Sequence, residues 1–360
     1  MDYNEDNEEK NENEELLLEK EKTKKNCKIG MFKLFFFYML IILIQTSVGI
    51  KKEKKMINLS CEPNKVRPKN KSKKADNLKV ALCTMGKREN LYAKEYVEYY
   101  YNLGLDQIFI YDDNDPNTEK ISDTIEDKYK QFVTVFENIK GKIKNQGDAF
   151  TDCYQRNKDK FDWILMVDMD EFLYIINDTL KDYLANNNLD KCDFIKFHWL
   201  CPTDNDLIYY DNRTLFERFK GPYIKSVFIK SIVRGHISDL KYWVHSPSYS
   251  PERNVTCNNV GQKLSYERLN FESIDEINVE KAFLIHFRYK STEEFIGKFK
   301  RGYSDWFGSR LQGFINANLK DYFGENQLTM EKIEFVEKEL NVSLLKLKIK
   351  YYFSKIFYLG

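Results

Sequence analysis

The chain of 360 residues has almost no net charge, because its 57 Lys and Arg residues offset its 56 Asp and Glu residues. Without a basic excess, nucleic acid is not indicated as a partner. The seven cysteines include no Cys-x-x-Cys pair and no zinc-ligand spacing, which excludes the common structural zinc sites. We also find no internal repeat, which excludes a solenoid or a propeller. Hydrophobic residues nevertheless make up 42% of the chain, enough for a substantial core.

The first part of the chain predicts attachment to a membrane. Residues 1–28 are densely charged and predict a disordered cytosolic tail. Residues 34–50 carry no charge, and together with the residues just before them they predict a transmembrane signal anchor over 29–50. A cleaved signal peptide is the alternative, because Ser47-Val48-Gly49 offers small residues at a cleavage position. Residues 51–77 are rich in Lys and lack apolar periodicity, which is typical of an extended stem.

A folded domain is predicted over residues 78–310, with a C-terminal helical extension over 311–360. Apolar runs alternate with helical patterns up to residue 173, which predicts an α/β fold with a mainly parallel sheet flanked by helices. The strands are expected near 79–84, 107–111, 132–136 and 163–167, and the helices near 91–103, 118–130 and 147–160. Later strands are expected near 194–200, 227–233, 242–245 and 282–289, and later helices near 180–185, 291–301 and 329–357.

Three carboxylates follow directly after the fourth of these strands, Trp163–Val167, at Asp168, Asp170 and Glu171. Because side chains alternate along a strand, we expect the two aspartates to point to one side and the glutamate to the other. Neighbouring carboxylates repel one another unless a cation lies between them, and oxygen ligands favour Mg²⁺ or Mn²⁺. Open α/β sheets bind ligands at the carboxyl ends of their strands. The pattern therefore predicts a divalent-cation site, with a plain acidic turn as the alternative.

The cysteines and glycosylation sequons give weaker indications. The predicted domain contains five cysteines, which allow two disulfides and one free thiol, although the pairing is left open: Cys83, Cys153, Cys192, Cys201 and Cys257. Six Asn-x-Ser/Thr sequons all follow the predicted anchor, at Asn58, Asn70, Asn177, Asn212, Asn254 and Asn341. Their placement favours a single-pass type II protein of the Golgi or endoplasmic reticulum with a lumenal catalytic domain.

Five blocks in a fixed order carry a resemblance to a known family. They are Lys87–Tyr99, Gly104–Asp112, Gln146–Leu173, Lys225–His245 and Leu284–Gly302. In these blocks the chain resembles glycosyltransferase family 92 and its family 2-like relatives, which have the Rossmann-like GT-A fold. Tyr96, Tyr100 and Gly235 depart from the family pattern, where Trp, His and Pro are usual. The two tyrosines are expected to concern packing.

The resemblance implies an inverting hexosyltransferase that moves a sugar, with galactose the first candidate, from a UDP-sugar donor to a glycan hydroxyl. It implies that Asp168 and Asp170 hold Mn²⁺ or Mg²⁺ and that Asp112 or Asp113 contacts the uridine. A histidine is expected as a further metal ligand. We rank His245 ahead of His286, because cations that follow His286 suit diphosphate binding better than a metal site.

The remaining site residues predicted from this resemblance are a base and donor-binding groups. Inversion requires a base that deprotonates the acceptor hydroxyl, and Glu217, Asp211 and Asp305 are the candidates. Glu89 falls in the first matching block and, like Arg288 and Lys290, is expected to contribute to donor binding.

Two other classes compete with this interpretation. A haloacid-dehalogenase-type phosphatase also uses Asp-x-Asp after a strand, but its motif lies near the start of the domain and continues with Thr or Val where this chain has Phe172. A catalytically inactive, membrane-anchored glycan-binding protein with a transferase fold is the second. The surviving carboxylates and histidines argue against that loss of activity.

Overall fold

The structure is a computed structural model that describes residues 56–57, 59, 61, 73–186, 188–248, 254–264, 277–301 and 309–357. The predicted tail, the predicted anchor over 29–50 and most of the predicted stem lie outside the described residues. Among the described helices, none combines the length and the apolar character needed to cross a membrane.

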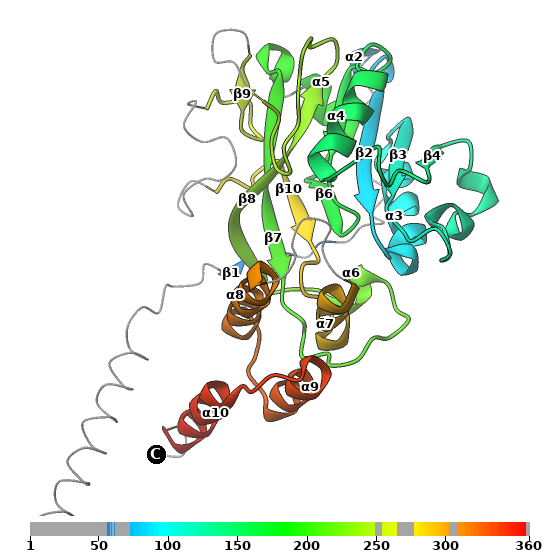
Figure 1. Ribbon diagram of the computed structural model, residues 1–360. Helices are drawn as coiled ribbons and strands as arrows, with labels where there is room; N and C mark the ends of the chain where they lie inside the picture. Colours follow the sequence, from blue (N-terminus) through cyan, green and yellow to red (C-terminus); the bar gives the residue numbers. More distant parts are fainter. Residues whose placement is uncertain are drawn as a thin grey trace, which may run out of the picture. The chain divides into compact units, whose positions relative to one another are not determined.

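A mixed sheet organises the described residues, with the strand order β4-β3-β2-β5-β8-β7-β10-β6 (Figure 1). The strands on this path are β2 (Val80–Gly86), β3 (Gln107–Asp112), β4 (Val133–Phe136), β5 (Trp163–Met166), β6 (Glu171–Ile175), β7 (Phe194–Pro202), β8 (Tyr223–Arg234) and β10 (Ala282–His286). Two short strands pair beside it, β1 (Met56–Ile57) with β8 and β9 (Thr256–Cys257) with β7.

The prediction of a mainly parallel sheet holds for one half of it. Strands β4, β3, β2 and β5 run parallel to one another, whereas β8 is antiparallel to both β5 and β7. Strand β10 is parallel to β7 and antiparallel to β6. A continuous apolar run shows that a strand is buried on both faces but does not encode its direction. The sequence pattern therefore could not distinguish the two halves.

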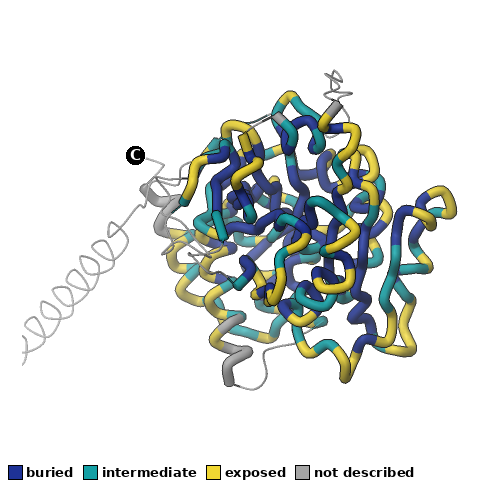
Figure 2. Tube along the Cα trace, turned by 90° about the horizontal axis from the view of Figure 1, so that it is seen from above, coloured by how far each residue is buried: buried dark blue, intermediate teal, exposed yellow. Residues whose placement is uncertain are grey.

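Helices cover both faces of the parallel half. Helix α3 (Asn90–Leu103) packs on the face that receives Val80 and Leu82 of β2, and α4 (Gln146–Asn157) packs on the face that receives Ala81 and Cys83. This division follows from the alternation of side chains along β2. Figure 2 shows the buried residues gathered in the interior and the exposed ones on the outer turns of the chain.

Two predicted elements differ from the structure. The helix expected near 118–130 is instead two 3₁₀ helices, η1 (Ile121–Thr124) and η2 (Asp127–Tyr129). Ile121, Ile125 and Tyr129 are buried at a helical spacing, but Ile125 is extended and breaks the helix. The strand expected over 242–245 is a turn with an isolated bridge from Tyr242 to Pro247. Tyr242 of this turn is buried, whereas Trp243 and Val244 are exposed, and none of the three belongs to a strand of the sheet.

The C-terminal helices share a core with α7 (Thr292–Arg301). Helices α8 (Ser309–Glu325), α9 (Met330–Leu340) and α10 (Leu345–Phe357) follow it, and side chains of α7, α8 and α9 form one hydrophobic cluster. Lys332 of α9 is buried and pairs with Asp204, 2.8 Å away, just after β7. The domain boundary predicted at residue 310 thus falls within a set of helices that pack together. Helices α2 (Lys73–Asp76), α5 (Leu180–Asn186), η3 (Leu189–Lys191) and α6 (Leu215–Arg218) complete the described helices.

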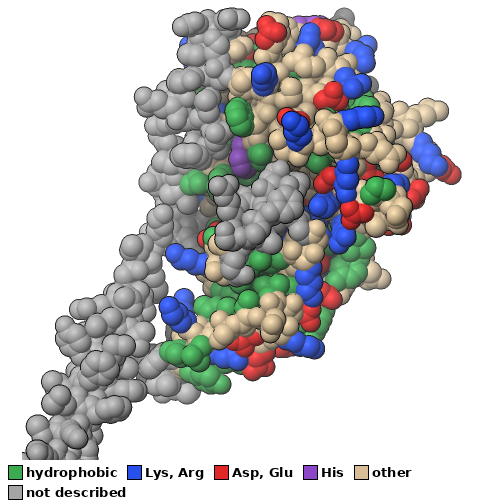
Figure 3. Space-filling model, viewed as in Figure 1, with side chains coloured by type: hydrophobic (Ala, Val, Ile, Leu, Met, Phe, Trp, Pro, Cys, Tyr) green, Lys and Arg blue, Asp and Glu red, His purple; other side chains and the backbone are tan. Residues whose placement is uncertain are grey.

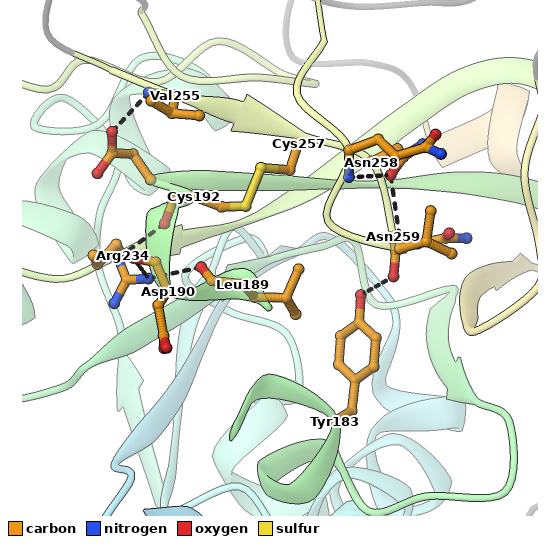
Figure 4. The surroundings of a disulfide bond; sticks show 12 residues. Tyr183, Leu189, Asp190, Cys192, Arg234, Val255, Cys257, Asn258 and Asn259 are labelled. Carbon is orange, nitrogen blue, oxygen red and sulfur yellow. Dashed lines mark hydrogen bonds between the residues drawn. A yellow bond between two sulfur atoms is a disulfide. The ribbon is translucent and has the colours of Figure 1, made fainter. Parts of the chain in front are cut away.

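Two disulfides connect segments far apart in sequence. Cys83 of β2 is bonded to Cys153 of α4, and Cys192 before β7 is bonded to Cys257 of β9. Figure 4 shows the second bond, with Arg234 beside it donating to the carbonyl oxygens of Leu189, Asp190 and Cys192. Cys201 is a free, buried thiol. The five cysteines thus form two disulfides and one thiol, as their number allowed.

Candidate active site

The carboxylates lie in a tight turn between β5 and β6. The backbone N–H of Glu171 donates to the carbonyl oxygen of Asp168 at 3.1 Å, and the Glu171 carboxylate accepts the N–H of Asp168 at 3.0 Å. Strand β5 ends at Met166, so this reciprocal pairing and not strand alternation sets the side-chain directions. Asp168 and Asp170 both line one cavity, while Glu171 points into the core.

Tyr100 of α3 fixes the start of β6 just after this turn. Its hydroxyl donates to the carbonyl oxygen of Glu171 at 2.8 Å and accepts the N–H of Leu173 at 3.1 Å. Tyr100 is fully buried, so these bonds form away from water. Tyr100, which stands where the family usually has His, therefore packs in the core and also positions the carboxylate turn.

Lys230 of β8 is the counter-charge of this turn. Its buried ammonium lies 2.8 Å from Oδ1 of Asp168, which also accepts a hydrogen bond from Gln146, and it donates to the carbonyl oxygen of Val244 at 2.7 Å. Burial by itself lowers the pKa of Lys230, but Asp168 and Glu171 outweigh burial and raise it. Burial and the charge of Asp168 together hold the pKa of Glu171 well above its usual value.

His286 lies directly beside Asp170. Strand β10 pairs with β6 so that His286 is opposite Glu171, which brings its Nε2 to 3.4 Å from Oδ1 of Asp170. Lys298 of α7 lies 2.7 Å from the other oxygen, Oδ2. Burial would raise the pKa of Asp170, but Lys298 and His286 hold it well below its usual value. Burial also lowers the pKa of His286, which favours the neutral ring that can ligate a metal.

His245 is further from the carboxylates. Its Nδ1 lies 3.2 Å from the carbonyl oxygen of Ile229, and its ring stacks on Phe228. The ring of Trp199 contacts both His245 and His286, with centroid separations of 5.3 and 4.3 Å. Burial, followed by the charge of Lys230, lowers the pKa of His245 to about 4. The geometry thus favours His286 over His245 as a partner of Asp170, which is opposite to the order we predicted.

The cavity at this turn has a volume of about 300 Å³ and carries charges of both signs. Besides Gln146 and His286, its polar and charged lining residues are Lys87, Glu89, Asp113, Asp168, Asp170, Arg288, Lys298, Arg301 and Asn318. The cations lie on the loops after β2 and β10 and on α7. Such a pocket suits a ligand that carries several negative charges together with polar groups.

Glu89 organises the cations on one wall of the cavity. It forms ion pairs with Arg301 and with Lys290, whose Nζ is 3.2 Å away. Burial would raise the pKa of Glu89, but these two cations lower it. Lys290 is buried over the ring of Tyr92, so it supports the wall from behind, whereas Arg288 and Arg301 line the cavity itself.

The two aspartates after β3 have different environments. Both carboxylate oxygens of Asp112 accept backbone N–H groups, one from Asn114 and one from Ile121, each at 2.8 Å. Asp113 lines the cavity, and burial raises its pKa. Of the pair predicted to contact the nucleoside, Asp113 is the residue with access to a ligand, and Asp112 holds the turn.

Two of the three candidate bases, Asp211 and Glu217, are described, and both lie outside the cavity. Asp211 pairs with Arg213 at 2.6 Å, and Glu217 caps α6 by accepting from the backbone N–H of Thr214 at 2.9 Å. Neither lines the cavity. Asp305 lies outside the described residues. Both carboxylates are thus engaged locally, Asp211 in an ion pair and Glu217 in a helix cap.

Two lysines of the site were missed in the sequence. Lys230 is the one charged residue within the buried segment Ile229–Val233. A charged side chain in a buried strand indicates that an oppositely charged partner lies next to it. Lys298 gave no such signal, because it lies among other cations on α7, and only the packing of that helix brings it to Asp170.

Comparison with known proteins identifies the family. The family model of glycosyltransferase family 92 matches residues 76–310, which includes the carboxylate turn, Lys230, His286 and α7. The chain belongs to glycosyltransferase family 92. The cavity at the turn is therefore the candidate active site.

The curated relatives are plant proteins that match over a limited length. A family 92 protein of Oryza sativa subsp. japonica is 31% identical over 109 residues, which cover 30% of this chain and 18% of that protein. One from Arabidopsis thaliana is 30% identical over 95 residues, or 26% of this chain and 16% of that protein. The match thus spans less than a fifth of either relative.

Among solved structures, CMP:2-keto-3-deoxy-manno-octonic acid synthetase complexed with CTP is similar at a TM-score of 0.25 and 13% identity. The likeness covers 43% of this chain and 74% of that one. At this level it supports no conclusion about function.

We predict that Lys230→Met lowers the free energy of unfolding by about 3–5 kcal/mol, because it leaves the buried Glu171 and the partly exposed Asp168 side by side without their counter-charge. Urea unfolding followed by circular dichroism measures the change. Lys225→Met, on the same strand but partly exposed, is the matched control and should change stability little. Equal effects of the two substitutions would contradict the role given to Lys230.

Proposed function

We propose that this protein is a metal-dependent, inverting glycosyltransferase that moves a sugar from a UDP-sugar to a glycan hydroxyl, with galactose as the first sugar to test. The observation that carries the proposal is one cavity that joins the Asp168–Asp170 turn to His286 and to the cations of α7. Departure of a nucleoside diphosphate needs neutralisation of its developing charge, and this cavity supplies groups for that purpose.

The residues of the turn fit a divalent cation. Asp170 and His286 face each other, and Asp168 lines the same cavity, so two carboxylates and one imidazole converge there. Among the residues that the structure describes, no three His, Cys, Asp or Glu side chains form a ready-made metal site. Lys298 instead neutralises Asp170. Bound Mn²⁺ or Mg²⁺ would act as a Lewis acid toward the diphosphate. Asp168, Asp170 and His286 would hold it.

The cations are placed to bind the diphosphate itself. Lys298 reaches the cavity from α7, where its Nζ donates to Asp170 at 2.7 Å and to the carbonyl oxygen of Arg288 at 2.8 Å. Arg288 and Arg301 line the same cavity. Charge-assisted hydrogen bonds from such groups to phosphate are stronger than neutral ones. The nucleoside would extend toward Asp113 at the carboxyl end of β3, as in other open α/β sheets.

An inactive glycan-binding protein remains the second candidate. It is disfavoured because the charges in this cavity are costly to bury without a function. Glu89, Asp168 and Asp170 each have a cationic partner in the cavity wall or behind it. Glycan recognition alone does not require such a set of paired charges.

The catalytic base stays a prediction. Asp305 is a candidate for it and lies outside the described residues.

We predict that Asp170→Ala lowers kcat at least about 100-fold, since a metal ligand contributes several kcal/mol to transition-state stabilisation. UDP release from a panel of UDP-sugars, with glycan acceptors and MnCl₂, measures the loss.

We predict that His286→Ala raises the Mn²⁺ concentration needed for half-maximal activity and weakens Mn²⁺ binding measured by calorimetry. His245→Ala serves as the comparison, and a larger shift in His245→Ala than in His286→Ala would restore the order predicted from sequence.

We predict that Lys298→Met raises the KM for the donor about 10- to 100-fold, because one charge-assisted hydrogen bond to phosphate is lost. Initial rates at saturating acceptor measure the change. Lys300→Met is the matched control on the same helix, where Lys300 is half exposed and pairs with Glu339 outside this cavity. An unchanged donor KM in Lys298→Met would show that Lys298 serves only to neutralise Asp170.

We also propose a lumenal location for the catalytic domain, supported by the two disulfides, which form in oxidising compartments. Among the described residues, the sequon asparagines Asn177, Asn212 and Asn341 are exposed. We predict that treatment with an N-glycosidase increases the mobility of the expressed protein on a gel. Replacing all three asparagines by Gln should remove most of this shift. Complete protease sensitivity of the domain in sealed microsomes would contradict the proposal.

A further inference from the structure

A surface of aromatic side chains lies beside the candidate active site. Trp243 is 70% exposed and Phe228 is 39% exposed, although large aromatic residues are ordinarily buried. Trp199 lies beneath Phe228, with ring centroids 5.4 Å apart. We call Trp199, Phe228 and Trp243 the aromatic platform. Figure 3 shows that on one face of the molecule a histidine side chain reaches the surface next to hydrophobic side chains.

A β-bulge creates one part of this platform. Between the pairs His198–Ile229 and Leu200–Lys225, strand β7 contributes only Trp199 while β8 contributes residues 226–228. Phe228 lies among these extra residues, and its side chain is exposed although it lies within the strand. Bulges beside active sites commonly redirect a side chain in this way.

The platform is continuous with the reaction centre. Trp199 packs with its edge against His286 at a centroid separation of 4.3 Å, and His286 faces Asp170 in the cavity. The buried Nε1 of Trp199 has no hydrogen-bond partner among the described residues. Trp199 therefore forms a wall between the metal-binding side of the site and the exposed ring of Phe228.

The turn that carries Trp243 is held near the same carboxylates. Lys230 donates to the carbonyl oxygen of the next residue, Val244, and to Asp168, so one ammonium connects the Trp243 turn to the carboxylate turn. Gly147 packs against this turn, since a Cβ at that position would lie 3.6 Å from Cα of Trp243 and 2.8 Å from the carbonyl oxygen of Tyr242. The turn thus has a fixed position, and the indole on it is nevertheless exposed.

We propose, on the basis of the proposed function, that the aromatic platform binds a sugar ring of the acceptor glycan. The donor nucleotide would occupy the Asp113 side, at the ends of β2 and β3, and the diphosphate would lie against α7. Among the described residues, the side of the turn toward β8 and β7 offers another approach to the reacting carbon, and Trp199 and Phe228 of the platform lie on those strands. An acceptor must enter from the side opposite the leaving group in an inverting transfer.

The chemistry of the platform matches a carbohydrate. One face of a pyranose presents C–H groups with partial positive charge, which pack on the negative face of an aromatic ring. Its hydroxyl groups remain free for polar partners at the edge. A nucleobase would stack equally well, but β7 and β8, which carry Trp199 and Phe228, lie across β5 from β3, the strand that precedes Asp113. A protein partner would need a larger continuous apolar surface than these rings provide.

The test compares Trp243→Ala and Phe228→Ala with Tyr352→Ala, a matched change of a 59% exposed aromatic residue on α10. The full-length protein is assayed with UDP-galactose and other UDP-sugars, and oligosaccharides ending in β-linked galactose or in fucose serve as acceptor probes. We expect the acceptor KM to rise about tenfold or more in both platform variants, while the donor KM stays unchanged. Trp243→Phe should retain most of the acceptor affinity.

A glycan array printed with the same oligosaccharides reports binding without turnover. Weaker binding by both platform variants than by Tyr352→Ala supports the platform. Unchanged acceptor KM and unchanged array binding in the platform variants would overturn it, as would a parallel rise in the donor KM. If the wild-type protein releases no UDP from any donor but binds the array through the platform, the proposed transferase activity fails and the platform stands. If the wild-type protein binds no oligosaccharide, the platform fails.

Discussion

A single buried ammonium, that of Lys230, connects the parts of the active site. It balances the charge of the carboxylate turn through Asp168 and at the same time holds the carbonyl oxygen of Val244. Buried carboxylates this close together cannot all be ionised without a cation near them. Lys230 lies on β8, and β8 pairs antiparallel with β5. This pairing brings the ammonium to the carboxylate turn, where it offsets the repulsion between the carboxylates. The mixed sheet is in this sense a requirement of the site.

Several of the remaining cations at the site have a carboxylate partner before a ligand arrives. Lys298 lies against Asp170, and Arg301 and Lys290 lie against Glu89. An anionic ligand that enters such a pocket meets groups already oriented by their neighbours, which reduces the reorganisation needed in the reaction. Helix α7 provides two of these cations, and the hydrophobic cluster with α8 and α9 fixes that helix. Distant apolar packing thus supports the electrostatics of the pocket.

Much of the fold follows from local patterns. The apolar runs of β2, β3 and β5 and the helices α3 and α4 between them could be recognised because hydrophobic periodicity is a local property. The acidic turn could be recognised for the same reason, since Asp168 and Asp170 are neighbours in the chain. The segment 118–130 was misread because a helical spacing of buried residues also occurs in two short 3₁₀ helices. Strand direction after β6 could not be read, because no local pattern encodes it.

The sequence by itself determined the α/β class, the carboxylate turn and the order of the family 92 blocks, all of which depend on residues close together in the chain. Only the tertiary structure decided which distant residues meet that turn. It placed His286 rather than His245 beside Asp170, through the register of β10 on β6, and it removed Asp211 and Glu217 from the site. The physical reason is that contacts between strands depend on register and connection, which a single sequence pattern leaves unspecified.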